Sequence, residues 1–205
     1  MAATAQPGPQ PGPEAESRAS RFMRSALAIL GETGRTDFTV LEIVERSKTS
    51  LRAFYQHFPT KDELLLALVE KIMTDATARW RLETESLPAP DALRHLIERI
   101  SAPAESSTQD SINRGLTYYN DHLLGSRPKE FAAVLSPLHR LFADIVRRGI
   151  AEGAFRADLD VEGDAAILMQ TVLGALRISE LGAELTGSAI DTGQVFGFCL
   201  RALAR

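Results

Sequence analysis

The chain has 205 residues, of which 44% are hydrophobic, 24% charged and 6% aromatic, and its formal net charge is −4 at pH 7. This balance is typical of a globular protein and excludes collagen-like, disulfide-scaffold and wholly disordered chains. No apolar run is long enough to span a bilayer, and the first residues do not resemble a signal peptide. The single cysteine, Cys199, cannot form an internal disulfide. We therefore expect a cytoplasmic protein that does not contact a membrane.

The negative net charge hides a locally basic segment. Residues 18–61 hold eight Lys and Arg against four Asp and Glu, whereas residues 62–205 hold fifteen against twenty-one. A basic segment on an acidic chain is typical of a module that binds a polyanion such as nucleic acid. The same imbalance also arises by chance on a solvated face, so charge alone leaves both interpretations open.

The first part of the chain predicts a tail and then four helices. Residues 1–17 hold four of the ten prolines and no apolar periodicity, which predicts a disordered tail. Apolar residues then recur at helical spacing over about 18–31, 40–46, 51–57 and 61–85. Thr39 with Glu42, and Thr60 with Glu63, have the spacing of capping boxes that would begin the second and fourth helices.

The rest of the chain predicts five more helices. Pro88 and Pro90 break the chain, and a polar loop is expected at 102–110. The predicted helices cover about 91–101, 111–124, 128–152, 164–185 and 191–204, and Pro137 should kink the third of these. The sequence therefore predicts an all-α fold of about nine helices. We place domain limits at 18–62 for a three-helix N-terminal unit and at 63–205 for a larger helical unit.

Residues 39–58 have the build of a helix-turn-helix, two short helices joined by a short turn. In this motif the second helix lies in the major groove of DNA, with its first residues facing base edges. Those residues are Ser50, Leu51, Arg52 and Ala53. The Arg52 guanidinium suits guanine, Ala53 suits a thymine methyl, and Gln56 suits adenine.

Further residues of this segment could contact the phosphate backbone. Tyr55, His57 and Lys61 lie where a backbone would pass, and the helix that begins after Thr39 offers free backbone N–H groups. The alternative is an ordinary helical hairpin with a basic face, because short helix pairs are common.

The literal residues of this segment resemble the DNA-binding region of the tetracycline-repressor (TetR) family of transcriptional regulators. The positions that match the family pattern are Thr39, Val40, Ile43, Ser47, Ser50, Ala53, Phe54, Tyr55, His57, Phe58, Thr60, Lys61, Asp62 and Leu64. The resemblance covers residues 18 to about 75 directly. It implies an N-terminal helix-turn-helix domain that binds double-stranded operator DNA. It also implies a C-terminal helical domain that pairs into a homodimer and binds a small effector.

Two residues depart from the family pattern. Lys48 stands where glycine is usual in the turn, and if that position needs a positive φ the lysine costs roughly 1 kcal/mol. Leu51 stands where a polar or basic residue is frequent, which removes one possible contact to a base or a phosphate. Both departures affect the expected operator sequence more than DNA binding itself.

The last two predicted helices are apolar around most of their circumference, so each must be buried on two sides. One side can face the core of its own chain and the other a second copy in a two-fold interface. The alternative is that both sides are covered within one monomer. The expected interface residues are Ile167, Thr171, Gly174, Ala175, Ile178, Val195, Phe196, Cys199 and Leu203.

An effector pocket is expected between helices 91–126, 128–152 and 164–185. Such pockets are mostly apolar with a few polar groups. The candidate residues are Trp80, Tyr118, Tyr119, His122, Phe131, Leu135, His139, Phe142 and Met169. Aromatic residues and Met at helical spacing are more often plain core, so each of these has that alternative.

The leading hypothesis is a ligand-responsive transcriptional repressor that binds a palindromic operator as a homodimer and is released by a small apolar or aromatic effector. An alternative is a helical small-molecule-binding protein with weak or no operator binding, which only Lys48 and Leu51 favour. An enzyme is a third class. No nucleophile elbow, phosphate-binding loop or metal-ligand spacing appears in the sequence. We therefore expect no catalytic residues, no cofactor and no metal site.

Overall fold

The computed structural model describes residues 17–180 and 190–204. Within these ranges it contains nine α-helices and no strand, which confirms the all-α prediction. The helices are α1 (Arg18–Thr33), α2 (Val40–Arg46), α3 (Leu51–His57), α4 (Lys61–Thr84), α5 (Ala89–Ile100), α6 (Ser107–Ser126), α7 (Pro128–Ala151), α8 (Val161–Glu180) and α9 (Thr192–Leu203). The predicted tail at 1–16 and the predicted helix end at 181–185 lie outside the described residues.

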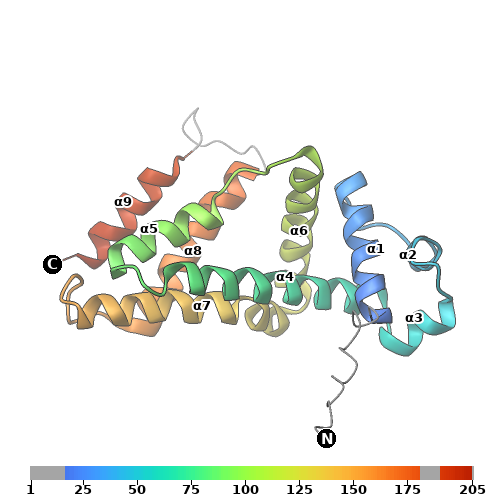
Figure 1. The fold of residues 1–205 in the computed structure, drawn as a ribbon, viewed down its shortest axis with the longest axis horizontal. Coiled ribbons are helices and arrows are strands. Elements are labelled where there is room, and N and C mark those ends of the chain that lie inside the picture. The colour runs from blue at the N-terminus through green and yellow to red at the C-terminus, as the bar shows by residue number, and fades with distance from the viewer. Residues whose placement is uncertain (1–16, 181–189, 205) are drawn as a thin grey trace, which may run out of the picture.

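The helices form two groups joined by one long helix (Figure 1). Helices α1–α3 lie at one end of the molecule, and α5, α8 and α9 lie at the other. Helix α4 runs from the first group to the second beside α7, and α6 packs against α1 as well as against α7 and α8. Two buried hydrophobic clusters follow this division, one centred on α1–α4 and one on α5, α7, α8 and α9.

Two predicted boundaries were wrong. The polar loop at 102–110 is shorter, because Ser106 accepts a hydrogen bond from the Gln109 backbone N–H at 3.1 Å and α6 begins at Ser107. Pro90 does not break the chain but lies in the first turn of α5. A proline is accommodated there because the first backbone N–H groups of a helix have no intrahelical acceptor. Helix α7 continues through Pro137.

The two predicted capping boxes have different outcomes. Thr39 and Glu42 form a complete box, in which Thr39 Oγ1 accepts from the Glu42 N–H at 3.2 Å and the Thr39 N–H donates to Glu42 Oε2 at 2.6 Å. At α4, Thr60 Oγ1 accepts from the Glu63 N–H at 3.1 Å. The Glu63 carboxylate does not complete this box, because it pairs with Arg127 Nη1 at 2.9 Å.

The N-terminal cluster holds α3 against α1 through aromatic packing. The Phe54 ring, on α3, is fully buried and meets the Phe22 ring of α1 edge to face, with centroids 5.3 Å apart. Phe58 follows α3 and lies 6.4 Å from the same ring. Edge-to-face pairs stabilise a core beyond their burial alone. The orientation of α3 is thus fixed by its inner side, and its other side is left to solvent.

The C-terminal cluster fills the space between α5, α7, α8 and α9. It includes four α9 residues, Val195, Phe196, Cys199 and Leu203, and burial raises the pKa of the Cys199 thiol. Arg94 of α5 lies over the Phe196 ring, 4.1 Å from its centroid. In the part of the chain that the structure describes, no helix is long and apolar enough to cross a membrane.

Candidate DNA interface and effector cavity

Helix α3 presents an exposed row of side chains opposite its buried Phe54. Leu51, Arg52, Tyr55 and Gln56 are exposed, whereas Ala53 is partly buried against the N-terminal cluster. Ser50 caps the helix, its Oγ accepting from the Ala53 N–H at 3.2 Å. The exposed residues therefore occupy one rigid face, because a capped helix on a packed aromatic core has little freedom to rotate.

The residues expected at the phosphate backbone have specific contacts within the chain. The Thr39 N–H and hydroxyl both donate to the Glu42 carboxylate, and these hydrogen bonds lower the Glu42 pKa. His57 is exposed, with its ring 6.1 Å from that of Phe22. Lys61 Nζ donates to the Thr36 backbone oxygen at 2.8 Å and lies 5.4 Å from the Phe38 ring centroid. Lys61 thus fastens the loop between α1 and α2.

The turn between α2 and α3 has a left-handed residue. Lys48 has a φ of 51°, in the region that favours glycine. The Lys48 N–H donates to the Glu45 oxygen at 3.1 Å, and the Thr49 N–H donates to the Val44 oxygen at 2.9 Å. This position therefore does need a positive φ, and the lysine occupies it at a conformational cost.

A cavity of about 300 Å³ lies between α4, α6, α7 and α8. Most of its wall is apolar, and its polar residues come from α6 and α8. The lining residues are Met73, Thr117, Asn120, Asp121, Leu124, Phe131, Leu135, Gln170, Leu173, Gly174, Leu176 and Arg177. An apolar cavity with a few polar groups is the usual form of a small-molecule site.

Two polar features mark this cavity. Asn120 Oδ1 is buried and accepts no hydrogen bond from the described residues. Asp121 accepts two hydrogen bonds from the Arg177 guanidinium, at 2.9 and 3.2 Å, so an ion pair joins α6 to α8 at the cavity. A buried acceptor without a donor is unfavourable unless something else donates to it. Asn120 Oδ1 is thus an acceptor in this cavity without a donor among the described residues.

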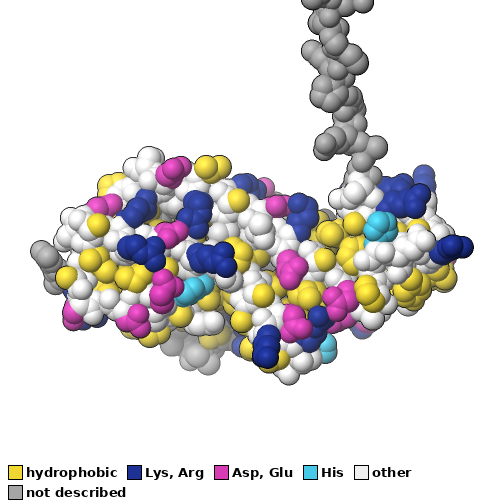
Figure 2. Space-filling model, turned by 90° about the horizontal axis from the view of Figure 1, so that it is seen from below, with side chains coloured by type: hydrophobic (Ala, Val, Ile, Leu, Met, Phe, Trp, Pro, Cys, Tyr) yellow, Lys and Arg dark blue, Asp and Glu magenta, His cyan; other side chains and the backbone are white. Residues whose placement is uncertain are grey.

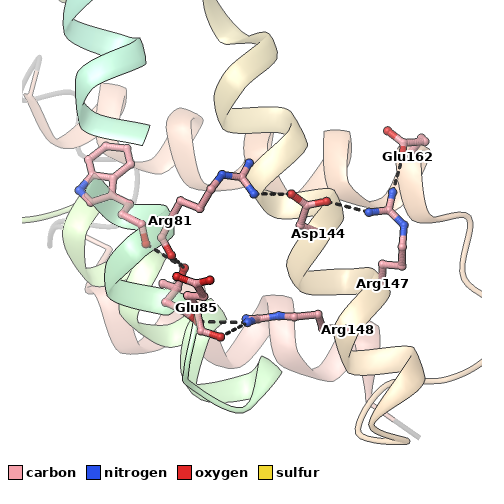
Figure 3. Close-up of polar contacts among 8 residues, drawn as sticks. Arg81, Glu85, Asp144, Arg147, Arg148 and Glu162 are labelled. Carbon is pink, nitrogen blue, oxygen red and sulfur yellow. Dashed lines mark hydrogen bonds and ion pairs between the residues drawn. The ribbon is translucent and has the colours of Figure 1, made fainter. Parts of the chain in front are cut away.

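A larger cavity, of about 550 Å³, lies between the end of α4 and α7. Three of its charged side chains form ion pairs (Figure 3): Asp144 accepts from Arg81 at 2.6 Å and from Arg147 at 2.7 Å, and Arg147 also donates to Glu162. Arg148 donates to the Thr84 and Glu85 backbone oxygens at the end of α4. Desolvation acts to raise the Asp144 pKa, but the two arginines outweigh it and lower that pKa. This network fastens α4 to α7.

The structure brings only part of the predicted effector set to the smaller cavity. Phe131 and Leu135 line it. The other seven residues lie elsewhere. Tyr118 and His122 are exposed, His139 contacts the Glu162 backbone oxygen at 3.0 Å, and Trp80 packs against the C-terminal cluster; Tyr119, Phe142 and Met169 are buried in the two clusters.

Sequence reasoning missed most of the lining residues, although a signal for them exists. Asn120, Asp121 and Leu124 follow Thr117 at helical spacing, and Gln170, Leu173 and Arg177 repeat at the same spacing on α8. A mixed polar and apolar stripe of this kind resembles a solvent-exposed face. Only the neighbouring helices turn it into a cavity wall.

The predicted interface residues separate into two groups. On α8, Ile167 and Gly174 are exposed, and Thr171, Ala175 and Ile178 are partly so. On α9, the residues Val195, Phe196, Cys199 and Leu203 are buried in the core of the chain itself. The described structure thus has no free surface at those four residues. The exposed aromatic residue of α9 is Phe198, which is 57% exposed.

Helix α6 connects the cavity to the N-terminal helices. Tyr119 donates to the Asp62 backbone oxygen at 3.1 Å, in the first turn of α4. Burial, followed by the nearby Asp62, raises the Tyr119 pKa. Arg127, at the end of α6, pairs with Asp62 at 3.2 Å and with Glu63 at 2.9 Å. The same helix therefore lines the cavity and holds the start of α4, directly after α3.

Comparison with known proteins finds a family model that matches the N-terminal helices and relatives similar over most of the chain. Residues 22–68 match the model of the bacterial regulatory proteins of the tetR family. The transcriptional repressor KstR2 of Mycobacterium tuberculosis is 24% identical over 184 residues, covering 86% of this chain and 88% of the relative. Proteins of this family are DNA-binding regulators and not enzymes, which agrees with the expectation from sequence.

Solved structures share the fold over nearly the whole chain. The fatty acid degradation regulator FadR of Bacillus halodurans has a TM-score of 0.70 at 15% identity, covering 89% of this chain and 98% of its own. FadR of Bacillus subtilis, solved in complex with stearoyl-CoA, has a TM-score of 0.70 at 16% identity, with coverages of 88% and 96%. At these identities the likeness establishes the fold alone.

Proposed function

Because residues 22–68 match the tetR family model and the chain is similar to the repressor KstR2 over most of its length, we propose that it belongs to the tetR family and is a homodimeric, cytoplasmic repressor of transcription. It binds an inverted-repeat operator through its N-terminal domain (residues 18–62). It releases that operator when a small molecule occupies the cavity between α4, α6, α7 and α8 in its C-terminal domain.

The observation that carries this proposal is the exposed face of α3. Leu51, Arg52, Tyr55 and Gln56 are available to solvent, while Phe54 and the Ser50 cap fix the helix from behind. A short, rigid helix with an arginine near its start suits insertion into a major groove. The positive charge of residues 18–61 adds attraction to phosphate.

Pairing through the last two helices is supported by their outer surfaces. Ile167 of α8 is 64% exposed and Phe198 of α9 is 57% exposed. Contiguous exposed apolar patches often mark surfaces through which proteins associate. We therefore propose that Ile167, Thr171, Gly174, Ala175, Ile178 and Phe198 face the second copy, whereas the four buried α9 residues support the interface from within.

The cavity suits an apolar effector that carries a hydrogen-bond donor for Asn120. The solved stearoyl-CoA complex of Bacillus subtilis FadR, which has the same fold, supports a small-molecule ligand of this general kind. An effector acts by preferring one conformation of the protein over another. Because α6 both lines the cavity and contacts Asp62, a shift of α6 would reposition α4 and the adjoining α3.

The proposal is tested by recovering fragments of sheared genomic DNA bound to the purified protein at two salt concentrations. A recurrent inverted repeat, bound less well at high salt, is the expected result. Recovery of random fragments alone would contradict operator-specific binding. Recovery of none would favour a helical ligand-binding protein that has lost DNA binding.

Replacing Arg52 by alanine is expected to reduce discrimination at one base pair of each half-site by about 1–3 kcal/mol, because a bidentate contact to guanine is lost. Affinities for the operator and for operators substituted at each position measure this effect. Arg140→Ala is the matched control, since Arg140 is an exposed arginine on α7. Equal losses on all sequences would assign Arg52 to phosphate contact instead.

Replacing Asn120 by leucine is expected to raise the free energy of unfolding of the ligand-free protein by about 1–2 kcal/mol, because a buried acceptor without a donor is removed. Urea unfolding of both proteins measures the difference. A loss of stability would mean that Asn120 has a structural partner, and the cavity would then lack its proposed polar anchor. Thr74→Val, at an exposed position of α4, serves as a control for removing a polar group elsewhere.

A further inference from the structure

A basic cleft of about 510 Å³ lies between the middle of α1 and the turn that joins α2 to α3. Two arginines of α1 and two cationic residues of the turn region line it. Its residues are Arg21, Arg24, Ser25, Ala28, Arg46, Ser47 and Lys48. Arg46 forms an ion pair with Glu32 at the end of α1. The cleft gathers four of the eight cationic residues of the 18–61 segment.

Two observations distinguish this cleft from a solvated basic surface. Lys48 is held at a φ of 51°, where glycine would have no steric cost. Arg21 Nε is buried and donates to no described residue. A strained backbone and an unsatisfied buried donor both lower stability, and such features persist where they serve a function.

The cleft is next to the start of the proposed DNA-binding helix along the chain. Ser47 and Lys48 line it, and Ser50, Leu51 and Arg52 follow within four residues at the start of α3. The end of the molecule that carries these helices has Lys and Arg side chains on the face seen in Figure 2. A major-groove helix is flanked by backbone phosphates, so a cation next to its start lies beside that backbone.

We propose that this cleft binds a backbone phosphate of DNA beside each half-site, with Lys48 and the two α1 arginines as its cations. This inference rests on the proposed function, since it assumes that α3 enters the major groove. It assigns a role to the lysine that replaces glycine in the turn. Lys48 contributes affinity that does not depend on sequence, at the cost of a strained turn.

The test compares Lys48→Gly and Lys48→Asn with the unsubstituted protein. Both residues tolerate a positive φ, and both remove the cation. We expect affinity for the operator and for random DNA to fall together, on the order of fivefold at low salt, and the salt slope to decrease by about 0.9. Lys48→Arg should retain the slope. Lys129→Gln removes an exposed lysine from α7 and controls for net charge.

The outcomes separate this inference from the proposed function. An unchanged salt slope in both neutral variants, with operator binding intact, would overturn the phosphate site and leave the repressor proposal standing. A loss confined to the operator would assign Lys48 to base contact and would also overturn it. If the unsubstituted protein binds no DNA, both proposals fail. Unfolding in urea checks folding independently, because Lys48→Gly should be at least as stable as the unsubstituted protein.

Discussion

Truncating Phe54 to alanine is expected to lower the free energy of unfolding by about 3–5 kcal/mol, the usual cost of removing a fully buried aromatic ring. The ring meets Phe22 at 5.3 Å and Phe58 at 5.9 Å, so its loss leaves a cavity that the α1–α3 packing cannot easily close. Operator binding should fall with it, because α3 loses the contact that fixes its orientation. Urea unfolding and DNA affinity measure the two effects.

Leu51→Ala is the matched control for the stability measurement. Leu51 lies on the same helix but is 45% exposed, so its truncation should change stability by less than about 1 kcal/mol. A loss from Phe54→Ala as small as that from Leu51→Ala would mean that α3 is not held by the N-terminal cluster. The rigid DNA-binding face proposed for α3 would then be wrong.

The N-terminal helices could be predicted closely because their signals are local. Thr39, Ser50 and Thr60 each cap the helix that follows, and Phe54 and Phe58 are four residues apart in one helical turn. These features act within a few residues of chain and depend little on distant packing. The exposure of Leu51 and Arg52 then follows from the burial of Phe54.

The cavity could not be predicted to the same extent, because four helices far apart in the sequence create it. Tyr119 illustrates the difficulty: an aromatic residue at helical spacing was a reasonable pocket candidate, yet its ring packs in the N-terminal cluster and its hydroxyl bonds to Asp62. Its neighbour Asn120 lines the cavity instead. Successive residues of a helix point in directions about 100° apart. A small error in the predicted orientation of a helix therefore assigns a core residue to the cavity, or a cavity residue to the core.

The α9 residues show the same limit for surfaces. A helix that is apolar on all sides predicts burial on two sides but not which side meets its own chain. Packing against α5 buries Val195, Phe196 and Cys199, and Phe198 is left exposed. The number of helices could thus be predicted from the periodicity of the apolar residues. Which side of each helix is buried could not, because it depends on how the helices pack together.

Adding one methyl group at Gly149 is expected to lower the free energy of unfolding by about 1–3 kcal/mol, because the new atom would overfill a packed core. A Cβ on Gly149 would lie 2.1 Å from Cδ2 of the Phe155 ring, which is fully buried. The ring cannot easily withdraw. The Phe155 N–H donates to the Gly149 oxygen at 3.0 Å, and the Arg156 N–H donates to the Leu203 oxygen of α9 at 3.0 Å.

Gly125→Ala provides the control, since it makes the same change within α6, where a Cβ meets nothing within 4 Å. It should raise stability by up to about 1 kcal/mol, because alanine favours the helix over glycine. The losses of stability from Gly149→Ala and Phe155→Ala should not add, because the new methyl group no longer clashes once the Phe155 ring is removed. Additive losses would place the strain elsewhere. In that case the tight contact between the end of α7 and the following turn would not be what holds α9.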